Sequence, residues 1–331
     1  MSKARIAVLI PAYKPDFFEQ TLLGLYHQTF KEFDVYVSDD SFNEVICKKI
    51  NHWQKSGLFS NLNITKIIGP KNAWLNHRKL DYLYSKKYEF IHFLMDDDYI
   101  YPTFYEQHLA AHSQGDFSVS VSQRWLSDEK NTPIGRMPDA GFLTKNVSHF
   151  SPLEAHTLST MTLPICYNWL GELSNMMFRP EGKPLFELPP KAFNDMNYFG
   201  LHDIGTCLRL VQRKPLVFIS SFHSNFRQHA TQTTHSHRIW GSRSARLCWA
   251  SFALASYSKG FLDTSQLQEN LGYVRKLLIA EIPHDQELIE PLQIIDRRHA
   301  TLTEKITDLS QYLFKFFSSN PHLKQYLEMI K

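Results

Sequence analysis

The first hundred residues alternate two kinds of hydrophobic pattern. Short runs of consecutive apolar residues, such as Ile6–Ile10, have the length and composition of strands buried on both faces. The stretches between them place apolar residues three or four positions apart, as along one face of a helix. Strand and helix in strict alternation predict a parallel α/β sheet with right-handed crossovers. The expected strands are 6–10, 33–37, 63–68 and 90–94. One expected helix follows Asp16, which would cap it, and two further helices span 44–55 and 76–86.

The pattern changes twice further along the chain. Between about residues 115 and 235 it loosens into short strands at 117–121 and 216–220, with a helix at 205–212. From residue 240 onward it is almost wholly helical. We therefore divide the chain into a catalytic α/β part, 1–238, and a helical C-terminal extension, 239–331. Two apolar stripes carry the helical prediction: Leu267, Leu271, Val274 and Leu278, then Leu302, Ile306, Leu309, Leu313 and Phe316.

Composition removes several classes of protein. The 331 residues are 43% hydrophobic and carry a formal net charge of only +3, which argues against disorder and against a dedicated nucleic-acid binder. The four cysteines show neither zinc-ligand nor disulfide-framework spacing. The N-terminus lacks a signal-peptide pattern, and no stretch approaches the roughly 20 apolar residues that span a bilayer. We expect a soluble, cytoplasmic protein.

Acidic residues gather where predicted strands end. Asp39 and Asp40 follow the second strand, and Asp96, Asp97 and Asp98 follow the fourth. In open α/β sheets, ligands bind beyond the carboxyl ends of the strands. Three adjacent carboxylates repel one another, and a hard divalent cation such as Mg²⁺ or Mn²⁺ would relieve this and bridge to phosphate oxygens. The alternative is an ordinary solvated acidic turn.

Four segments in this order resemble family 2 glycosyltransferases of the GT-A fold. They are Ile6–Pro15 (IAVLIPAYKP), Tyr26–Phe30 (YHQTF), Val37–Ser41 (VSDDS) and Leu94–Pro102 (LMDDDYIYP). The resemblance covers roughly residues 4–235, and its order and spacing are more specific than any single motif. It implies a Rossmann-like nucleotide-binding sheet with helices on both faces. Residues 1–115 would bind a nucleotide-diphosphate sugar, with UDP as first choice, and residues 116–238 would face the acceptor.

The resemblance also assigns the donor nucleotide to particular residues. Pro11 and Tyr13 would line the base pocket, and Asp39 or Asp40 would accept a hydrogen bond from the base or ribose. Arg78 would meet the diphosphate, although a lone basic residue on a helix is commonly just solvated.

The acidic triplet would then be the DXD-type metal motif. Asp97 is the first choice as direct ligand, with Asp98 beside it and Asp96 on the nucleotide side. Many members have a further acidic residue where this chain has Met95, so the assignment within the triplet stays open. The segment from Phe226 resembles the family's late Arg-x-His motif, in which Arg227 would contact the diphosphate and His229 would add a metal ligand.

Inverting members use a carboxylate as general base, which would take the proton of the acceptor hydroxyl as that oxygen attacks the sugar. The matching residue is Asp203, with His202 in place of the usual Glu. Asp203 could instead be a helix N-cap, and His202 a packed histidine. Trp169 and Glu172 lie in a segment similar to the family's acceptor side, where they would bind the acceptor sugar, although an aromatic residue is more often part of the core.

The expected activity is thus metal-dependent, inverting transfer of a sugar to a hydroxyl of a glycan, a lipid-linked saccharide or a protein. Two alternatives remain: a catalytically degenerate nucleotide-sugar-binding scaffold, supported by Met95 and His202, and a sugar-nucleotide pyrophosphorylase, disfavoured by the missing glycine-rich loop after the first strand. The helical extension would pack on the catalytic part, form a homo-oligomer, or touch the inner face of the membrane. Its charge, 8 Lys and Arg against 10 Asp and Glu over residues 261–331, makes membrane contact the minor alternative.

Overall fold

The computed structural model describes residues 5–137, 149–186, 201–230, 232, 239–319 and 323–329. Within these, one mixed sheet forms the centre of the molecule, with the strand order β3-β2-β1-β4-β9-β6-β10-β5, while β7 pairs with β6 and β8 with β10. The strands are β1 (Ile6–Ala12), β2 (Phe33–Asp39), β3 (Ile64–Ile68), β4 (Phe90–Phe93), β5 (Tyr99–Ile100), β6 (Val119–Ser127), β7 (Pro133–Arg136), β8 (Phe150–Leu153), β9 (Met176–Phe178) and β10 (Leu216–Arg227). The helices are α1 (Phe18–Tyr26), α2 (Val45–Lys55), α3 (Ala73–Tyr84), α4 (Phe104–Ser113), α5 (Ala155–Thr162), α6 (His202–Leu210), α7 (Ile239–Ser258), α8 (Thr264–Glu281), α9 (Ile289–Asp296), α10 (Leu302–Ser318) and α11 (Leu323–Met329).

The first half of the sheet is the parallel unit that the sequence predicts. β1 pairs in parallel with β2 on one side and β4 on the other, and β2 pairs in parallel with β3. All seven residues of β1 are buried, which explains why the strand is apolar on both faces. The strand continues through Pro11 to Ala12, and α1 begins at Phe18 with no side-chain cap, so the expected cap by Asp16 is not formed.

The second half of the sheet is mixed, which the sequence did not predict. The short strand β9 pairs antiparallel with both β4 and β6 and so joins the two halves, while β6 and β10 run parallel. A strand of three residues carries too little periodicity to be recognised in a sequence. Its insertion keeps β4 at the centre of the sheet, with the acidic turn just beyond its end.

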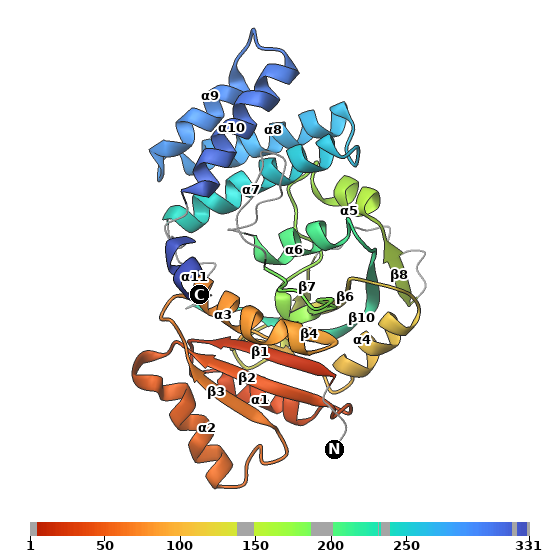
Figure 1. Ribbon diagram of the computed structural model, residues 1–331, viewed down its shortest axis with the longest axis vertical. Helices are drawn as coiled ribbons and strands as arrows, with labels where there is room; N and C mark the ends of the chain where they lie inside the picture. The colour runs from red at the N-terminus through yellow and green to blue at the C-terminus, as the bar shows by residue number, and fades with distance from the viewer. Residues whose placement is uncertain are drawn as a thin grey trace.

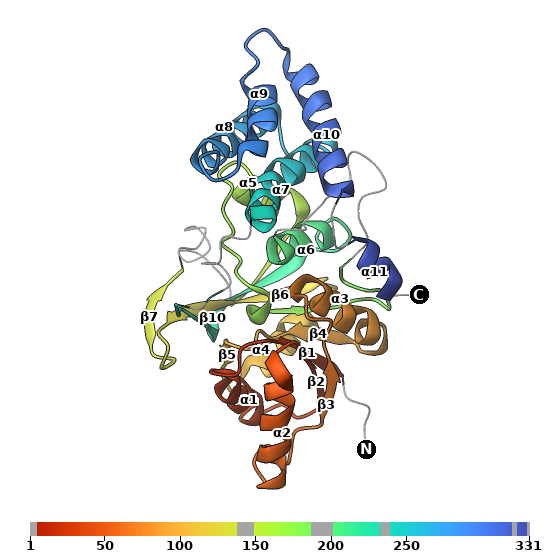
Figure 2. The same ribbon diagram turned by 90° about the vertical axis from the view of Figure 1, so that its left-hand side faces the viewer.

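Two hydrophobic clusters cover the two faces of the sheet. One contains Val8 and Ile10 of β1 together with residues of α1, α2 and α4. The other contains Ala7 and Leu9 of β1, continues through α3, α5 and α6, and extends without a break into α7, α8, α9 and α10. Figures 1 and 2 show α1 and α2 on one side of the sheet and the helices from α6 onward stacked on the other.

The C-terminal helices therefore add to the core of the sheet. All four residues of the first predicted stripe are buried on α8, and Leu309 and Leu313 of the second are buried on α10. The proposed boundary between 238 and 239 adjoins residues 233–238, which lie outside the described residues. None of the helices in the described part of the chain is long and apolar enough to cross a membrane.

Several buried histidines make the fold sensitive to acid. Burial lowers the pKa of His92 on β4 to about 3 and that of His112 on α4 to about 4. Both are therefore neutral in the folded protein at pH 5, whereas an unfolded histidine, with a pKa near 6.5, is already protonated. The unfolded state thus binds more protons, so stability falls as the pH drops from about 6.5 toward 4 and is unaffected by these groups above pH 7.

We predict that each of these histidines lowers the free energy of unfolding by about 2 kcal/mol between pH 7.5 and pH 5. Urea unfolding at both pH values measures this loss. The variant His112→Asn should lose about 2 kcal/mol less than the wild type over the same interval, because its side chain does not titrate. His27→Asn, a change at an exposed helix end, is the control. Equal losses in the wild type and His112→Asn would contradict the prediction.

Candidate active site

The acidic turn after β4 is the centre of the site. Asp96, Asp97 and Asp98 are only 7%, 9% and 2% exposed. A solvated acidic turn would leave these carboxylates in water, so that alternative does not describe them. Each carboxylate has a different partner from a distant part of the chain.

Asp96 holds the loop that follows β1. Its Oδ2 accepts hydrogen bonds from the backbone N–H groups of Tyr13 at 2.5 Å and Lys14 at 2.6 Å. Burial, followed by the charge of Asp97, raises the pKa of Asp96 to about 7. Asp96 therefore positions the loop through Oδ2.

Asp97 contacts the side chains of Lys14 and His229. Its Oδ2 lies 2.7 Å from Nζ of Lys14 and 3.0 Å from Nε2 of His229. Burial raises the pKa of Asp97, but Lys14 and His229 outweigh burial and bring the pKa below its usual value. Asp97 is therefore the member of the triplet whose ionised form the surroundings favour.

Asp98 is tied to the end of β10. Its Oδ1 accepts the backbone N–H of Arg227 at 3.2 Å, and its side chain also bonds Ser174. Burial and the neighbouring charge of Asp97 raise the pKa of Asp98 well above its ordinary value. Asp98 thus connects the turn to β10.

Arg227 supports the same turn from behind. It is fully buried, its Nε donates to the carbonyl of Asp97 at 2.7 Å, and its Nη1 donates to the carbonyl of Glu129 at 2.7 Å. Its guanidinium also lies 4.7 Å from the ring centre of Phe17. Nε and Nη1 of Arg227 are thus bound to backbone carbonyls and the residue does not line the cleft, so its expected contact with a diphosphate has no geometric support.

A cleft of about 820 Å³ opens over the carboxyl ends of β1, β2 and β4. Its volume lies within the range of small-molecule sites. It brings together seven residues that the sequence singled out: Pro11, Tyr13, Asp40, Asp96, Asp97, Asp98 and Glu172. Of the polar residues expected to gather at strand ends, Tyr13, Asp40 and the acidic triplet line this cleft, and Asp39 does not.

The structure separates Asp39 from Asp40. Asp39 is fully buried, and its carboxylate accepts from the backbone and hydroxyl of Ser41 and from the N–H of Cys47, so it organises the start of α2. Asp40 lines the cleft and accepts the backbone N–H groups of Lys71 at 2.7 Å and Asn72 at 3.1 Å. Burial raises the pKa of Asp40. Asp40 is therefore the member of the pair that lines the cleft.

Two further predicted residues are packed in the interior. Arg78 lies 4.1 Å from the ring centre of Trp74 and donates to the carbonyl of Phe186, so it does not line the cleft. Trp169 is a core residue whose Nε1 donates to Thr162, and it is buried at 2% exposure. Neither side chain reaches the cleft, which leaves the diphosphate and acceptor roles expected of them without geometric support.

Glu172 reaches the cleft from a turn held by Arg124. The Arg124 guanidinium pairs with Glu172 at 2.5 Å and donates to the carbonyls of Trp169 and Leu170 at 3.3 Å. Gly171 sits in this turn with φ +114°, a conformation that residues with a side chain rarely adopt. Glu172 therefore reaches the cleft in a fixed orientation.

Asp203 lies behind this turn in the first turn of α6. Its Oδ2 accepts from Nδ2 of Asn168 at 2.8 Å and its Oδ1 from the N–H of Ile204 at 2.8 Å, while the N-cap position belongs to Leu201. Burial raises the pKa of Asp203 to about 6. Its neighbour His202 stacks on His77 at 6.4 Å, and burial lowers the pKa of His202 well below its usual value. Neither Asp203 nor His202 lines the cleft directly.

Lys14, Lys71 and Phe42 are among the cleft residues to which the sequence analysis assigned no role. Lys14 forms the ion pair described above, Lys71 donates from Nζ to the carbonyl of Ser41 at 2.7 Å, and Phe42 is 81% exposed at the cleft. Phe42 is followed by Asn43 and Glu44 at φ 50° and 56°. Consecutive residues with positive φ mark a strained loop, and no pattern of hydrophobicity indicates such strain. The position of Lys14 directly after the Pro11–Tyr13 motif was the available signal.

The donor set suits a divalent cation only when a ligand completes it. Among the described residues, no group of three or more His, Cys, Asp or Glu side chains could hold a metal ion. Nε2 of His229 lies 3.0 Å from Oδ2 of Asp97, and Mg²⁺ sites in phosphate-binding proteins commonly use one or two carboxylates plus phosphate oxygens and water. These two residues therefore fit a cation that shares a diphosphate.

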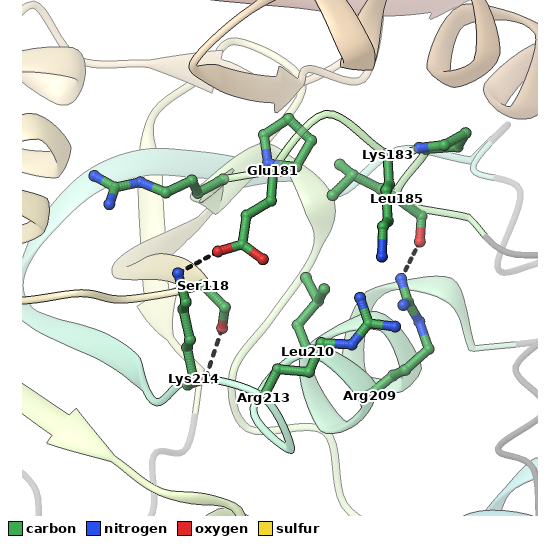
Figure 3. Close-up of a pocket in the computed structure, with 11 residues that line it drawn as sticks. Ser118, Glu181, Lys183, Leu185, Arg209, Leu210, Arg213 and Lys214 are labelled. Atoms are coloured by element: carbon green, nitrogen blue, oxygen red, sulfur yellow. Dashed lines mark hydrogen bonds and ion pairs between the residues drawn. The ribbon is translucent and has the colours of Figure 1, made fainter.

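A second, much smaller hollow lies away from this cleft (Figure 3). Its lining is rich in cationic residues, but Lys214 pairs with Glu181 and Arg209 donates to the carbonyl of Leu185. None of the predicted site residues lines this hollow, so we place the candidate active site in the larger cleft. The cationic residues that line the small hollow are Arg179, Lys183, Arg209, Arg213 and Lys214.

Comparison with solved structures agrees with the arrangement of the sheet. S. aureus TarS 1-349 in complex with UDP superposes with a TM-score of 0.54 at 13% identity, over 98% of this chain and 88% of that chain. TarS 1-349 in complex with UDP-GlcNAc gives 0.52 at 12% identity, over 95% and 91%. The chain has the GT-A fold. At this identity the likeness concerns the fold alone, and neither a family model nor a curated protein sequence matches the chain.

The turn at Gly171 offers a direct test of the packing around Arg124. A Cβ atom added there would lie 2.5 Å from Cζ of Arg124 and 2.5 Å from Oδ1 of Asn175. We predict that Gly171→Ala lowers the free energy of unfolding by about 2–5 kcal/mol, from backbone strain and overpacking together. Urea unfolding measures this loss.

Gly182→Ala is the matched control for that variant. Gly182 also has a positive φ, +74°, but an added Cβ would meet nothing within 4 Å. It should therefore show the backbone cost alone, about 1–2 kcal/mol. Equal losses in the two variants would show that the packing against Arg124 contributes nothing.

Proposed function

We propose that the protein is a metal-dependent, inverting glycosyltransferase of the family 2 type, with a nucleotide-diphosphate sugar as donor and a hydroxyl group as acceptor. The observation that carries this proposal is the cleft itself: it joins an aromatic-lined wall to the acidic turn at the carboxyl ends of three parallel strands. This is where open α/β sheets bind their ligands. The acceptor hydroxyl would belong to a glycan, a lipid-linked saccharide or a protein.

The nucleoside would occupy the side of the cleft next to β2. Tyr13 is 63% exposed and Phe42 81% exposed, so both offer apolar ring faces for stacking on a base. Asp40 adds a carboxylate that can accept an N–H or O–H hydrogen bond. UDP is our first choice of nucleotide, and the fold likeness to a protein crystallised with UDP and with UDP-GlcNAc supports it.

The diphosphate would then lie over the acidic turn. Lys14 is the cleft cation nearest to Asp97, and a lysine binds phosphate well as a compact positive charge. Asp97 and His229 would hold a Mg²⁺ or Mn²⁺ ion, whose chemistry is to neutralise charge on the departing diphosphate. Asp96 and Arg227 hold the backbone of the turn so that Asp97 keeps its orientation.

Asp203 is our candidate general base. It does not line the cleft itself, but Nδ2 of Asn168, which donates to its carboxylate, also donates to the carbonyl of Gly171, next to Glu172 of the cleft. A base works best when its pKa lies near the operating pH, and burial brings the pKa of Asp203 up to about 6. Asn168 orients the carboxylate, and Glu172, on the adjacent wall, offers its oxygens to acceptor hydroxyl groups. In the reaction, Asp203 would accept the hydroxyl proton while the acceptor oxygen attacks the anomeric carbon from the face opposite the diphosphate.

The donor assignment predicts metal-assisted binding of a nucleotide. We expect UDP, GDP or dTDP, tested by calorimetry, to bind more tightly with Mn²⁺ than with EDTA. Asp97→Asn should weaken binding in Mn²⁺ by at least about tenfold, because it loses the ionised ligand of the triplet, and should bring it close to the value in EDTA. Tight nucleotide binding that is indifferent to both EDTA and Asp97→Asn would contradict the metal assignment. Binding without transfer to any acceptor would instead favour the degenerate scaffold.

The general-base assignment predicts a pH profile. Because the base acts in its ionised form, kcat/KM for transfer should fall about tenfold per pH unit below about pH 6, as Asp203 becomes protonated. Asp203→Asn should lower kcat by about 10²- to 10⁴-fold at pH 7.5 and remove this limb from the residual rate. Glu172→Gln is the comparison variant, expected to raise KM for the acceptor and to keep the limb. If Glu172→Gln removed the limb and Asp203→Asn kept it, the base would be Glu172.

A further inference from the structure

Lys14 binds two carboxylates of the acidic turn, Asp96 and Asp97. Its backbone N–H donates to Oδ2 of Asp96 at 2.6 Å, and its Nζ donates to Oδ2 of Asp97 at 2.7 Å. Both side chains of this ion pair are largely buried, at 14% exposure for Lys14 and 12% for Asp97. The residue is therefore fixed at both ends to neighbouring carboxylates of the acidic turn.

The oxygen that Lys14 binds is also the one nearest to His229. Nε2 of His229 lies 3.0 Å from the same Oδ2 of Asp97. A divalent cation shared by Asp97 and His229 would bind at this oxygen, next to the ammonium group. Two cations at one partly buried oxygen repel strongly, since burial reduces the screening by water. The ammonium and a metal ion are thus alternative partners of Asp97.

We propose that Lys14 occupies the cation position at Asp97 in the free protein and moves to the diphosphate of the donor, which leaves Asp97 to the metal. This inference rests on the proposed function. The side chain of Lys14 lines the cleft, and its flexible four-carbon stem lets the ammonium turn from a carboxylate to a phosphate without moving the backbone. Lys14 is in this sense a positioning residue that links the binding of two ligands.

The link has a thermodynamic consequence. If the donor draws Lys14 away from Asp97, the donor raises the affinity for the metal, and the metal raises the affinity for the donor by the same factor. Couplings of this kind typically amount to between about 5- and 150-fold. A metal ion alone should bind the free protein weakly, because it competes with an ammonium that is already in place.

The experiment measures Mn²⁺ binding directly. The Kd of the full-length protein for Mn²⁺ is determined from the electron paramagnetic resonance signal of free Mn²⁺, and the Kd for UDP is determined by calorimetry with and without Mn²⁺. We expect Lys14→Met to bind Mn²⁺ at least about fivefold more tightly than the wild type in the absence of UDP. The gain in UDP affinity caused by Mn²⁺ should shrink by the same factor. Lys14→Gln, which keeps a hydrogen-bonding side chain, should behave like Lys14→Met, and thermal unfolding verifies that both variants fold.

Lys49→Met is the matched control. Nζ of Lys49 donates to the carbonyl of Pro15 at 3.1 Å, so this lysine holds the same loop without touching Asp97. It should leave the Kd for Mn²⁺ unchanged. Wild-type affinity for Mn²⁺ in folded Lys14→Met and Lys14→Gln would overturn the proposal. If the wild type bound no nucleotide, the proposed function would fail, while the Mn²⁺ measurement without UDP would still decide the competition at Asp97.

Discussion

The gathering of three carboxylates at the end of one buried strand is the constraint on which the site depends. Such a triplet is unstable by itself, because burial and mutual repulsion both raise the pKa of the members. The chain resolves this by giving each member a different partner: backbone amides for Asp96, cation-type side chains for Asp97, and the N–H of Arg227 for Asp98. These partners come from the loop after β1 and the end of β10, so the acidic turn joins the two ends of the α/β part.

The sheet places these distant partners within reach. β1 and β4 are adjacent and parallel, so the loop after β1 and the turn after β4 leave the sheet at the same edge. β10 reaches this edge because it pairs antiparallel with β5, the two-residue strand directly after the acidic turn. The site is therefore a consequence of strand order and of one short pairing.

The sequence predicted the parallel half of the fold because β1 is a continuous apolar run and strand and helix patterns alternate after it. The sequence also located the acidic turn and the loop after β1, because the order of the four motifs identifies these segments even where it does not identify the role of each side chain. The sequence could not tell which of Asp39 and Asp40 lines the cleft, because the two side chains differ only in the direction in which they leave the end of β2. Nor could it place Trp169 or Arg227, whose roles depend on Thr162 and on the carbonyl of Glu129, contacts that form only after folding. β9, with three residues, gives no periodic signal at all.

The C-terminal helices contribute to the core beneath the site. Their buried faces form one hydrophobic cluster with Leu9 of β1 and Phe93 of β4, so the core that supports the strands of the site is completed by residues more than 150 positions away. At the end of the described chain, α11 packs beside α3, the helix whose first turn supplies Asn76 and His77 to the cleft (Figure 1). A shared core makes the free energy of both parts interdependent, because removing the helices would expose apolar surface directly above the sheet. The extension thus stabilises the strands that hold the acidic turn, even though its residues carry none of the proposed chemistry.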